Sequence, residues 1–268
     1  MFSFRRGSRR MIQPLFKSAS SLSEAWADVF LSTMEKGGGT RHPVVVTIDG
    51  LEDDHEIEIP SIRARLDAEL NAFAENKCHT VANTIFPMSL WNPKLDDSAD
   101  VLFERYERAW PGIKKCAANK YGVYFRRLTA YQPDGVSGRV NQLEAIVQSY
   151  KRGNHRKSAL QVSIFDPTRD HTDQRQKGFP CLQQVSFTPL EHGLLSVTGF
   201  YATQYQFEKA YGNYLGLYWL GKFVAAQLGM TLSQVVCSAA VLSRGNPTAS
   251  QLQPLATDIK NLLADLRA

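Results

Sequence analysis

The sequence predicts a single domain of the α+β class. The chain has 268 residues, of which 43% are hydrophobic and 10% aromatic, so it can bury a large core. Strand-like and helical segments interleave without the regular βαβ alternation of a doubly wound sheet. There is no internal repeat, no low-complexity tract and no Gly-rich phosphate loop. These observations favour one compact α+β unit over several domains.

The net charge of +5 is concentrated at the N-terminus. Four of these charges come from Arg5, Arg6, Arg9 and Arg10, which leaves 27 basic and 26 acidic residues in the remainder. The body is therefore electrically balanced, and its charge does not indicate nucleic-acid binding.

We expect residues 1–15 to form a basic tail and residues 16–268 to form the domain. The tail has no acidic residue, which fits a plain tail, an organellar transit peptide or a nucleic-acid-contacting arm. It lacks the apolar segment of a secretory signal, so we expect a cytoplasmic protein, with organellar targeting left open.

The cysteine pattern argues against a metal-binding or disulfide-rich protein, and the hydropathy pattern argues against a membrane-spanning one. The four cysteines are widely spaced and form no CxxC pair, so neither a metal site nor a disulfide framework is predicted. Three of them, Cys78, Cys116 and Cys237, are interpreted as small core residues. No apolar run reaches the roughly 18 residues that a membrane span requires.

The N-terminal elements carry clear boundary signals. Ser21 and Glu24 form a capping box that begins a helix, and the glycine run 37–39 ends it. Pro43 then leads into the β-branched run VVVTI, which predicts a strand.

The next part of the chain is predicted to contain two helices. Residues 55–59 (HEIEI) alternate and predict a strand, and residues 62–75 are apolar at helical spacing. The proline-bounded segment 80–94 predicts a strand or loop near the core. Residues 100–110 predict a helix that Pro111-Gly112 ends.

The middle of the chain leads towards a long polar loop. Residues 140–150 predict a helix that ends at Gly153, and residues 159–166 predict a core strand. The polar stretch 167–178 is predicted to be a loop long enough to be functional.

The C-terminal part contains the stretch that organises the chain. Pro180 and Cys181 begin a predicted β-hairpin, which is followed by a long apolar helix that Gly229 caps. Residues 232–243 predict another apolar strand, and a last amphipathic helix is expected from Gln253.

Several short motifs in this order resemble the thymidylate synthase and pyrimidine hydroxymethylase family. They are spread over residues 121–243, about half of the chain, and the last is an asparagine at the mouth of the apolar helix. They are YGVYFR at 121–126, NQL at 141–143, FDP at 165–167, Pro180-Cys181, the Leu195-Ser196 strand and Asn213.

The resemblance implies a thymidylate-synthase-like fold with a large mixed sheet, and a homodimer with these sheets back to back. It also implies that the Cys181 thiolate attacks C6 of a pyrimidine nucleotide, with methylenetetrahydrofolate as the one-carbon donor. The side-chain amide of Asn213 would donate to O4 and accept from N3–H, which selects uracil.

The sequence also departs from the family pattern. Leu182 replaces the histidine after the cysteine, and Ala202-Thr203 stands at the place of an Arg-Ser pair. Tyr205 falls near the place of an acidic residue associated with folate binding. The ribose-binding H-x-Y becomes Ser243-Arg244-Gly245.

The remaining candidate residues follow from these departures. We count Thr203 and Arg244 as candidate substrate-binding residues, together with Arg126 and Arg156, and Arg127 as a further phosphate candidate. The general base is left between Glu104 and Glu107.

Each candidate also has a structural interpretation. Cys181 fits a core strand cysteine, Asn213 fits a helix N-cap, and Arg126 and Arg156 fit solvated or structural roles.

Three functions therefore stay open. The first is C5 one-carbon transfer, of a methyl or hydroxymethyl group, to a uracil nucleotide through Cys181 and a folate donor. The second is a nucleotide-binding or protein-interaction module without catalysis or cofactor. The third is an enzyme that acts on an atypical substrate, such as a non-phosphorylated or larger pyrimidine.

Overall fold

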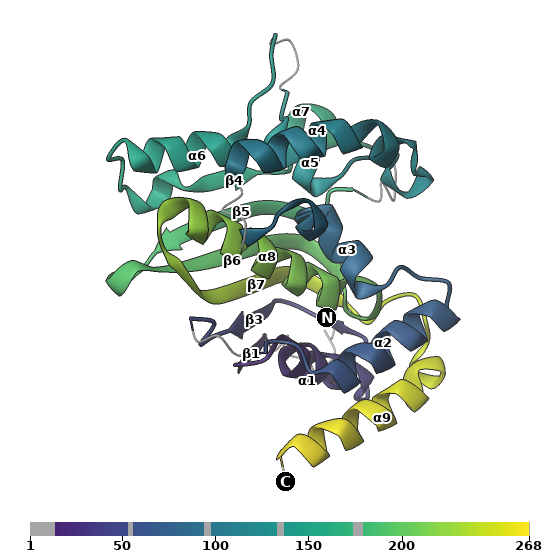
Figure 1. The fold of residues 1–268 in the computed structure, drawn as a ribbon. Coiled ribbons are helices and arrows are strands. Elements are labelled where there is room, and N and C mark those ends of the chain that lie inside the picture. Colours follow the sequence, from purple (N-terminus) through teal and green to yellow (C-terminus); the bar gives the residue numbers. More distant parts are fainter. Residues whose placement is uncertain (1–13, 53–55, 94–97, 133–136, 174–178, 268) are drawn as a thin grey trace, which may run out of the picture.

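The protein is an α+β molecule with one open mixed sheet, as predicted. The computed structural model describes residues 14–52, 56–93, 98–132, 137–173 and 179–267. Most of the predicted basic tail lies outside these residues. Figure 1 shows α4 to α7 at the top, α3 and α8 across the middle, and α1, α2 and α9 at the bottom.

The sheet formed by the described residues has seven strands. Its order is β1-β3-β7-β6-β5-β4, and β2 pairs with one end of β7. The pairs β1–β3 and β6–β7 are parallel, whereas the other pairs are antiparallel. The strands are β1 (Leu15–Ala19), β2 (Thr40–Arg41), β3 (Val44–Ile48), β4 (Gln161–Ser163), β5 (Leu182–Pro189), β6 (Leu194–Tyr205) and β7 (Thr231–Ser243).

The helices differ widely in length. They are α1 (Leu22–Met34), α2 (Pro60–Ala72), α3 (Cys78–Ile85), α4 (Ala99–Lys115), α5 (Tyr124–Thr129), α6 (Gln142–Lys151), α7 (Pro167–Asp170), α8 (Tyr211–Leu228) and α9 (Ala249–Arg267). A π-helix, Gln206–Ala210, joins β6 directly to α8.

Helix α8 is the centre of the core. It connects β6 to β7 and packs on both strands, with the side chain of Leu217 against Gly199 and the backbone of Gly221 against Val197. Gly229 ends the helix in the left-handed conformation, with φ 68°, which confirms the predicted cap.

The face of the sheet that α8 does not cover is called the open sheet face. Its side chains alternate along the strands with the buried ones, and most of them are exposed or half-exposed. We define this face by Phe16, Ser18, Val45, Thr47, Gln161, Gln184, Ser186, Ser196, Thr198, Phe200, Gln234, Val236 and Ser238.

Several predicted elements are confirmed. Ser21 Oγ accepts from the Glu24 N–H and caps α1, at 3.4 Å. The strand after Pro43, the helix within 140–150, the cysteine hairpin and the strand within 232–243 are all present. The last helix is also present, but it begins at Ala249 rather than at Gln253.

The strand predicted at 55–59 is wrong for residues 56–59, and residue 55 lies outside the described residues. The backbone of this segment bonds to the start of α1 instead of to a strand. The Ile57 carbonyl accepts from the Leu22 N–H at 2.9 Å, and the Ile59 N–H donates to Ser23 Oγ at 2.8 Å.

Two further element predictions need correction. Residues 80–85, predicted as strand or loop, lie in α3, which packs closely on Gly212 and Gly216 of α8. Helix α4 does not end before Pro111 but continues to Lys115, so the proline lies inside the helix and removes one N–H donor there.

Candidate active site

Cys181 lies immediately before β5 and is half-buried. Its carbonyl accepts from the Ala202 N–H of β6 at 3.0 Å. The Gln183 amide donates to the Pro180 and Cys181 carbonyls, at 2.6 and 3.2 Å. These bonds fix the backbone on both sides of the thiol.

The YGVYFR segment packs against the segment that precedes Cys181. Tyr124 Oη accepts from the Cys181 backbone N–H at 3.3 Å. The Tyr124 ring packs on Phe179 with 5.1 Å between centroids. A Cβ on Gly122 would lie 2.7 Å from the Phe179 ring, and its φ of +140° also requires glycine. Two of the predicted motifs therefore meet in space.

Arg127 also contacts the Phe179 ring. Its guanidinium lies 5.3 Å from the Phe179 ring centroid and forms a bidentate ion pair with Asp170, at 2.9 and 3.0 Å. It also donates to the Ile164 carbonyl at 2.9 Å. The Arg127 guanidinium is thus engaged in anchoring the chain on both sides of the predicted polar loop.

Asn213 is the third residue of α8 and is 4% exposed. It lies inside the helix, so the N-cap interpretation is wrong. Among the described residues, no hydrogen-bond partner is found for its side-chain amide. The amide therefore keeps its full capacity to donate and accept.

Lys209, in the π-helix, adds positive charge near the thiol. Burial raises the pKa of the Cys181 thiol, while the Lys209 ammonium and the Tyr124 hydroxyl lower this pKa and offset part of the rise. A π-turn directly before a helix is a frequent feature of functional sites. It carries Lys209 and ends three residues before Asn213.

Sequence reasoning missed Tyr124 and Lys209 as site residues. Tyr124 belongs to the YGVYFR motif, but nothing in its spacing pairs it with a cysteine 57 positions later. The available signal for Lys209 was the charged pair Glu208-Lys209 directly before an otherwise apolar helix.

Two of the predicted arginines lie in contacts within the protein. Arg126 forms an ion pair with Glu107 and stacks over Trp110, at 4.7 Å from the ring centroid. Arg244 donates to the Thr33 carbonyl from Nε and Nη2, at 3.1 and 2.8 Å.

The other predicted residues lie at the surface. Arg156 is exposed before a short 3-10 turn, and Thr203 is exposed on β6 opposite Val241. Of the general-base candidates, Glu107 pairs with Arg126 and Glu104 is exposed. No contact with the Cys181 thiol is recorded for any of these residues.

Two buried tyrosine hydroxyls lie behind Cys181. Tyr201 of β6 and Tyr214 of α8 are fully buried, and neither hydroxyl has a hydrogen-bond partner among the described residues. The Tyr201 hydroxyl is close enough to Tyr124, Cys181 and Cys237 to interact with them electrostatically.

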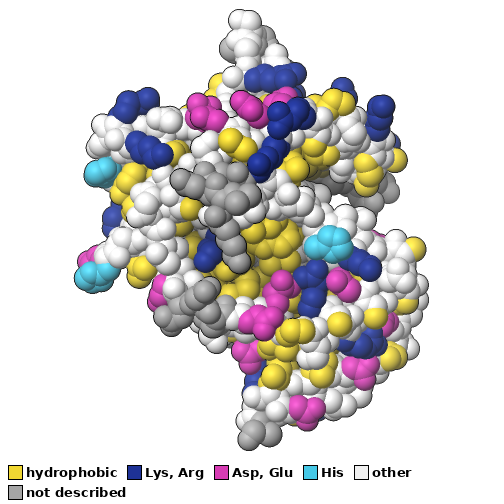
Figure 2. Space-filling model, viewed as in Figure 1, with side chains coloured by type: hydrophobic (Ala, Val, Ile, Leu, Met, Phe, Trp, Pro, Cys, Tyr) yellow, Lys and Arg dark blue, Asp and Glu magenta, His cyan; other side chains and the backbone are white. Residues whose placement is uncertain are grey.

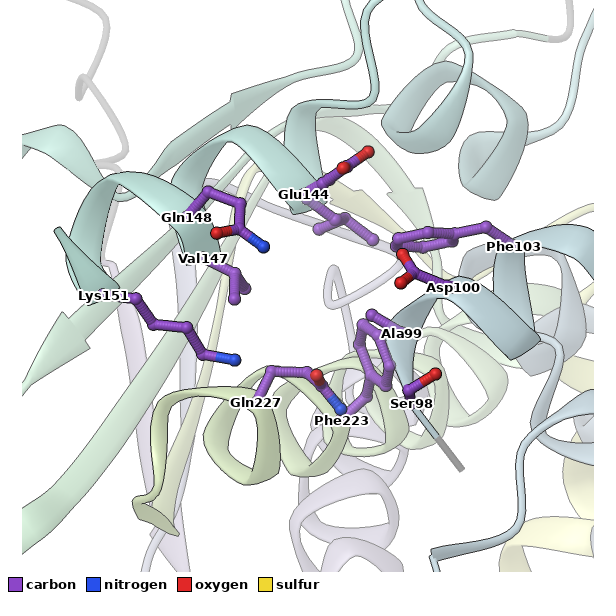
Figure 3. A pocket seen from close by; sticks show the side chains of 11 residues that line it. Ser98, Ala99, Asp100, Phe103, Glu144, Val147, Gln148, Lys151, Phe223 and Gln227 are labelled. Carbon is purple, nitrogen blue, oxygen red and sulfur yellow. The ribbon is translucent and has the colours of Figure 1, made fainter. Parts of the chain in front are cut away.

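A separate hollow of about 120 Å³ lies between α4, α6 and α8. Figure 3 shows Lys151 and Gln148 pointing into it from α6, with Phe223 and Gln227 on the α8 side. It contains none of the predicted site residues. Figure 2 shows hydrophobic side chains gathered at the centre of the face, where α3 and α8 lie in Figure 1.

No family model matches the chain, and no curated protein matches it in sequence. Among the described residues, no helix is long and apolar enough to cross a membrane. The same residues contain no group of three or more His, Cys, Asp or Glu side chains placed to hold a metal ion.

Proposed function

We propose that the protein has a thymidylate-synthase-like fold. Three features support this proposal: the Pro-Cys dipeptide at the start of an antiparallel hairpin, the helix α8 that crosses from β6 to β7, and the parallel pairing of these two strands. Asn213 lies in the first turn of that crossover helix.

We propose further that the protein transfers a one-carbon unit to C5 of a pyrimidine. The observation that carries this proposal is the meeting of the YGVYFR and Pro-Cys segments at Cys181, through the Tyr124 hydroxyl. A thiolate that adds to C6 of the ring moves an electron pair onto C5 and O4 as an enolate. C5 then attacks a one-carbon electrophile, its proton leaves to a base, and elimination of the thiolate from C6 restores the ring.

Asn213 is proposed to read the pyrimidine. The Asn213 side chain is 4% exposed and its amide has no hydrogen-bond partner among the described residues, so its donors and acceptor are open to a ligand. Its N–H can donate to O4, and its carbonyl can accept from N3–H of uracil. Cytosine presents the opposite pattern of donor and acceptor, which the same amide matches after a 180° rotation, so Asn213 is proposed to bind the pyrimidine edge of either base.

The phosphate group of the substrate is a separate question. Each charge-assisted phosphate contact contributes roughly 1.5–3 kcal/mol to binding. The side chains of Arg126, Arg127 and Arg244 donate to groups within the protein instead. Arg175 and Lys177 lie outside the described residues. A uracil nucleotide and a pyrimidine without phosphate are therefore the two forms to compare.

The folate donor does not fit the described residues well. At the place where the resemblance implies an acidic residue for folate, the chain has Tyr205, a phenol that is half-buried. We therefore derive no step through folate, and the donor is defined only as a one-carbon electrophile.

We also propose a homodimer that buries the open sheet face. The side chains that define this face are uncharged, and the Asp49 carboxylate at its end accepts from Ser18 and Gln234, at 2.8 and 2.7 Å. Charged residues are depleted at interface cores. Its polar groups are already paired across strands: Ser196 Oγ donates to Gln234 at 2.7 Å, and Gln184 donates to Gln161 at 2.9 Å. Such a surface can be covered without leaving polar groups unpaired.

The experiment that tests the function is intact-protein mass after incubation with 5-fluoro-dUMP, 5-fluorouridine or 5-fluorouracil. Each is added with and without methylenetetrahydrofolate, to the wild type and to Cys181→Ser, with Cys116→Ser as the control at an exposed cysteine. The expected result is an adduct that Cys181→Ser loses and Cys116→Ser retains. The fluoropyrimidine that forms it distinguishes nucleotide from non-phosphorylated substrate, and a heavier, folate-dependent adduct identifies the donor.

A non-catalytic binding module is the second candidate, because the predicted phosphate ligands Arg126 and Arg244 contact protein groups instead. Thermal stabilisation by a uracil nucleotide without any adduct would favour this module. The absence of both an adduct and stabilisation would contradict the pyrimidine proposal.

A further inference from the structure

The hollow between α4, α6 and α8 has an apolar floor. Leu143 and Val147 of α6 and Phe223 of α8 are buried there. Phe103 of α4 meets Phe223 with 6.1 Å between the ring centroids. With about 120 Å³, the hollow is several times larger than the roughly 15 Å³ that a single water molecule requires. It can therefore hold a small organic molecule with its apolar part on this floor.

One side of the hollow carries groups that can bind a carboxylate. Lys151 and Gln148 point into it from α6, and Gln227 lies on the α8 side (Figure 3). Among the described residues, the side chains of these three form no hydrogen bond and no ion pair. An ammonium and two amides offer N–H donors to both oxygens of a carboxylate, and the ammonium does so as a charge-assisted donor.

The other side of the hollow carries acidic groups. Asp100 lies in the first turn of α4, across the hollow from Lys151 in Figure 3. Glu144 lies in the first turn of α6, about two helical turns before Lys151. Neither carboxylate forms an ion pair within the described part of the chain. The hollow therefore presents a cation and two anions that do not pair with one another.

We propose that this hollow binds a free α-amino acid with an apolar side chain. The ligand carboxylate accepts from Lys151 and the two glutamine amides, and the ligand ammonium donates to Asp100. The apolar side chain of the ligand lies on Phe103 and Phe223. A zwitterion is the class of ligand that satisfies both sides of the hollow, because a carboxylate alone leaves the acidic groups unpaired and an amine alone leaves Lys151 unpaired.

This inference is independent of the proposed pyrimidine chemistry, because neither Cys181 nor Asn213 lines the hollow. Lys151 and Asp100 are exposed, so solvent screens their charges. Binding should therefore be weak, with a dissociation constant of about 1 mM.

The test is ligand-observed saturation-transfer NMR with L-leucine, 4-methylpentanoate and 3-methylbutylamine. The second compound lacks the ammonium of leucine, and the third lacks its carboxylate. Leucine should bind saturably, and each analogue should bind about tenfold more weakly, because one charge-assisted contact is missing.

Three variants assign the contacts to the two sides of the hollow. Lys151→Gln should weaken leucine about tenfold without weakening 3-methylbutylamine, and Asp100→Asn should weaken leucine about tenfold without weakening 4-methylpentanoate. Lys157→Gln, at an exposed lysine outside the hollow, is the matched control and should bind leucine like the wild type. All three positions are exposed, so the fold should be retained, and thermal unfolding checks this.

The absence of saturable leucine binding well above the expected dissociation constant would overturn the proposal. Equal affinities for leucine and 4-methylpentanoate, or equal leucine affinities in the wild type and both hollow variants, would also overturn it. The assay contains no pyrimidine, and Lys151→Gln should keep the fluoropyrimidine adduct that Cys181→Ser loses. A failure of this proposal is therefore distinguishable from a failure of the proposed function.

Discussion

At the scale of single residues, the ionisation of Cys181 is set by opposing contributions. Burial disfavours the thiolate, whereas the Lys209 ammonium and the Tyr124 hydroxyl favour it. The lysine and the tyrosine come from segments other than the one that carries Cys181. The candidate chemistry depends on these two side chains more than on the arginines that the motifs suggested.

We predict that Lys209→Gln slows the reaction of Cys181 with iodoacetamide near pH 7 by several-fold. Removing the cation raises the pKa of the thiol, so less thiolate is present at any pH below it. Lys222→Gln, which removes a lysine that lies over the ring of Tyr218, is the matched control. Equal rates in the two variants would show that the Lys209 charge is screened from the sulfur.

A buried aspartate links local structure to acid stability. Burial opposes ionisation of Asp166, but hydrogen bonds from Thr168 and Arg169 outweigh it and lower the pKa of this carboxyl to about 2. A carboxyl whose pKa is lower in the folded than in the unfolded state stabilises the fold at any pH above the unfolded-state pKa, which is near 3.8. This stabilisation is lost as the pH falls towards 2.

Asp166→Asn should therefore lower the free energy of unfolding by about 2 kcal/mol at pH 7. The difference from the wild type should shrink as pH falls from about 4 to 2, where the wild-type carboxyl also becomes neutral. Denaturant unfolding at each pH measures this, with the exposed Asp265→Asn as control. A difference that stays constant with pH would contradict the prediction.

At the scale of elements, the packing of α3 on α8 depends on two glycines. A Cβ on Gly212 would lie 2.5 Å from Val81 Cβ, and one on Gly216 would lie 2.8 Å from Ile85 Cβ. The two helices therefore approach more closely than side chains of any size would allow. Gly212 lies next to Asn213, so this contact also positions the start of α8.

Gly216→Ala should destabilise the protein by about 1–3 kcal/mol, because the added methyl group meets backbone and a branched side chain. Gly112→Ala in α4 meets nothing within 4 Å and should stabilise by roughly 1 kcal/mol through helix propensity. Unfolding midpoints in urea should move in opposite directions for the two variants. A neutral Gly216→Ala would mean that α3 can shift without cost.

The element scale also shows what the sequence could and could not predict. The cap at Ser21, the hairpin after Cys181 and the left-handed end of α8 at Gly229 follow from local signals, and all are present. The segment 80–85 was predicted incorrectly because a short apolar helix and a buried strand look alike in sequence. Its helical state is supported by the glycine face of α8, which is more than 120 residues away.

The same limit applies to the candidate site. Cys181 and Asn213 were named from their motifs, because a Pro-Cys dipeptide and a helix-opening asparagine are local patterns. Tyr124 was not named because its role depends on a contact that only tertiary structure creates. Arg126 and Arg244 are basic residues near the motifs, and sequence could not reveal that Glu107 and the Thr33 carbonyl hold them.

At the scale of the whole molecule, the open sheet face, whose defining side chains are uncharged, predicts self-association. Phe200 lies on this face and is 42% exposed. In a dimer, a second copy of the chain would bury the apolar side chains of this face together with polar groups that are already paired.

Light scattering after size exclusion should therefore give a dimer for the wild type and a monomer for Phe200→Lys, because a buried unpaired charge strongly opposes association. Leu266→Lys, at an exposed apolar residue of α9, should leave the dimer intact. A monomeric wild type at micromolar concentration would contradict the prediction.

The hydrogen bond between Tyr124 and the backbone of Cys181 joins residues 57 positions apart, and Lys209 follows another 28 positions later. While the chain is being synthesised, the cysteine is therefore added before the lysine that lies near it in the folded protein. Until β6 and α8 have folded onto the hairpin, the thiol is an ordinary cysteine with ordinary reactivity. The contacts that offset part of the effect of burial on the Cys181 thiol therefore form only after the later segments have been added.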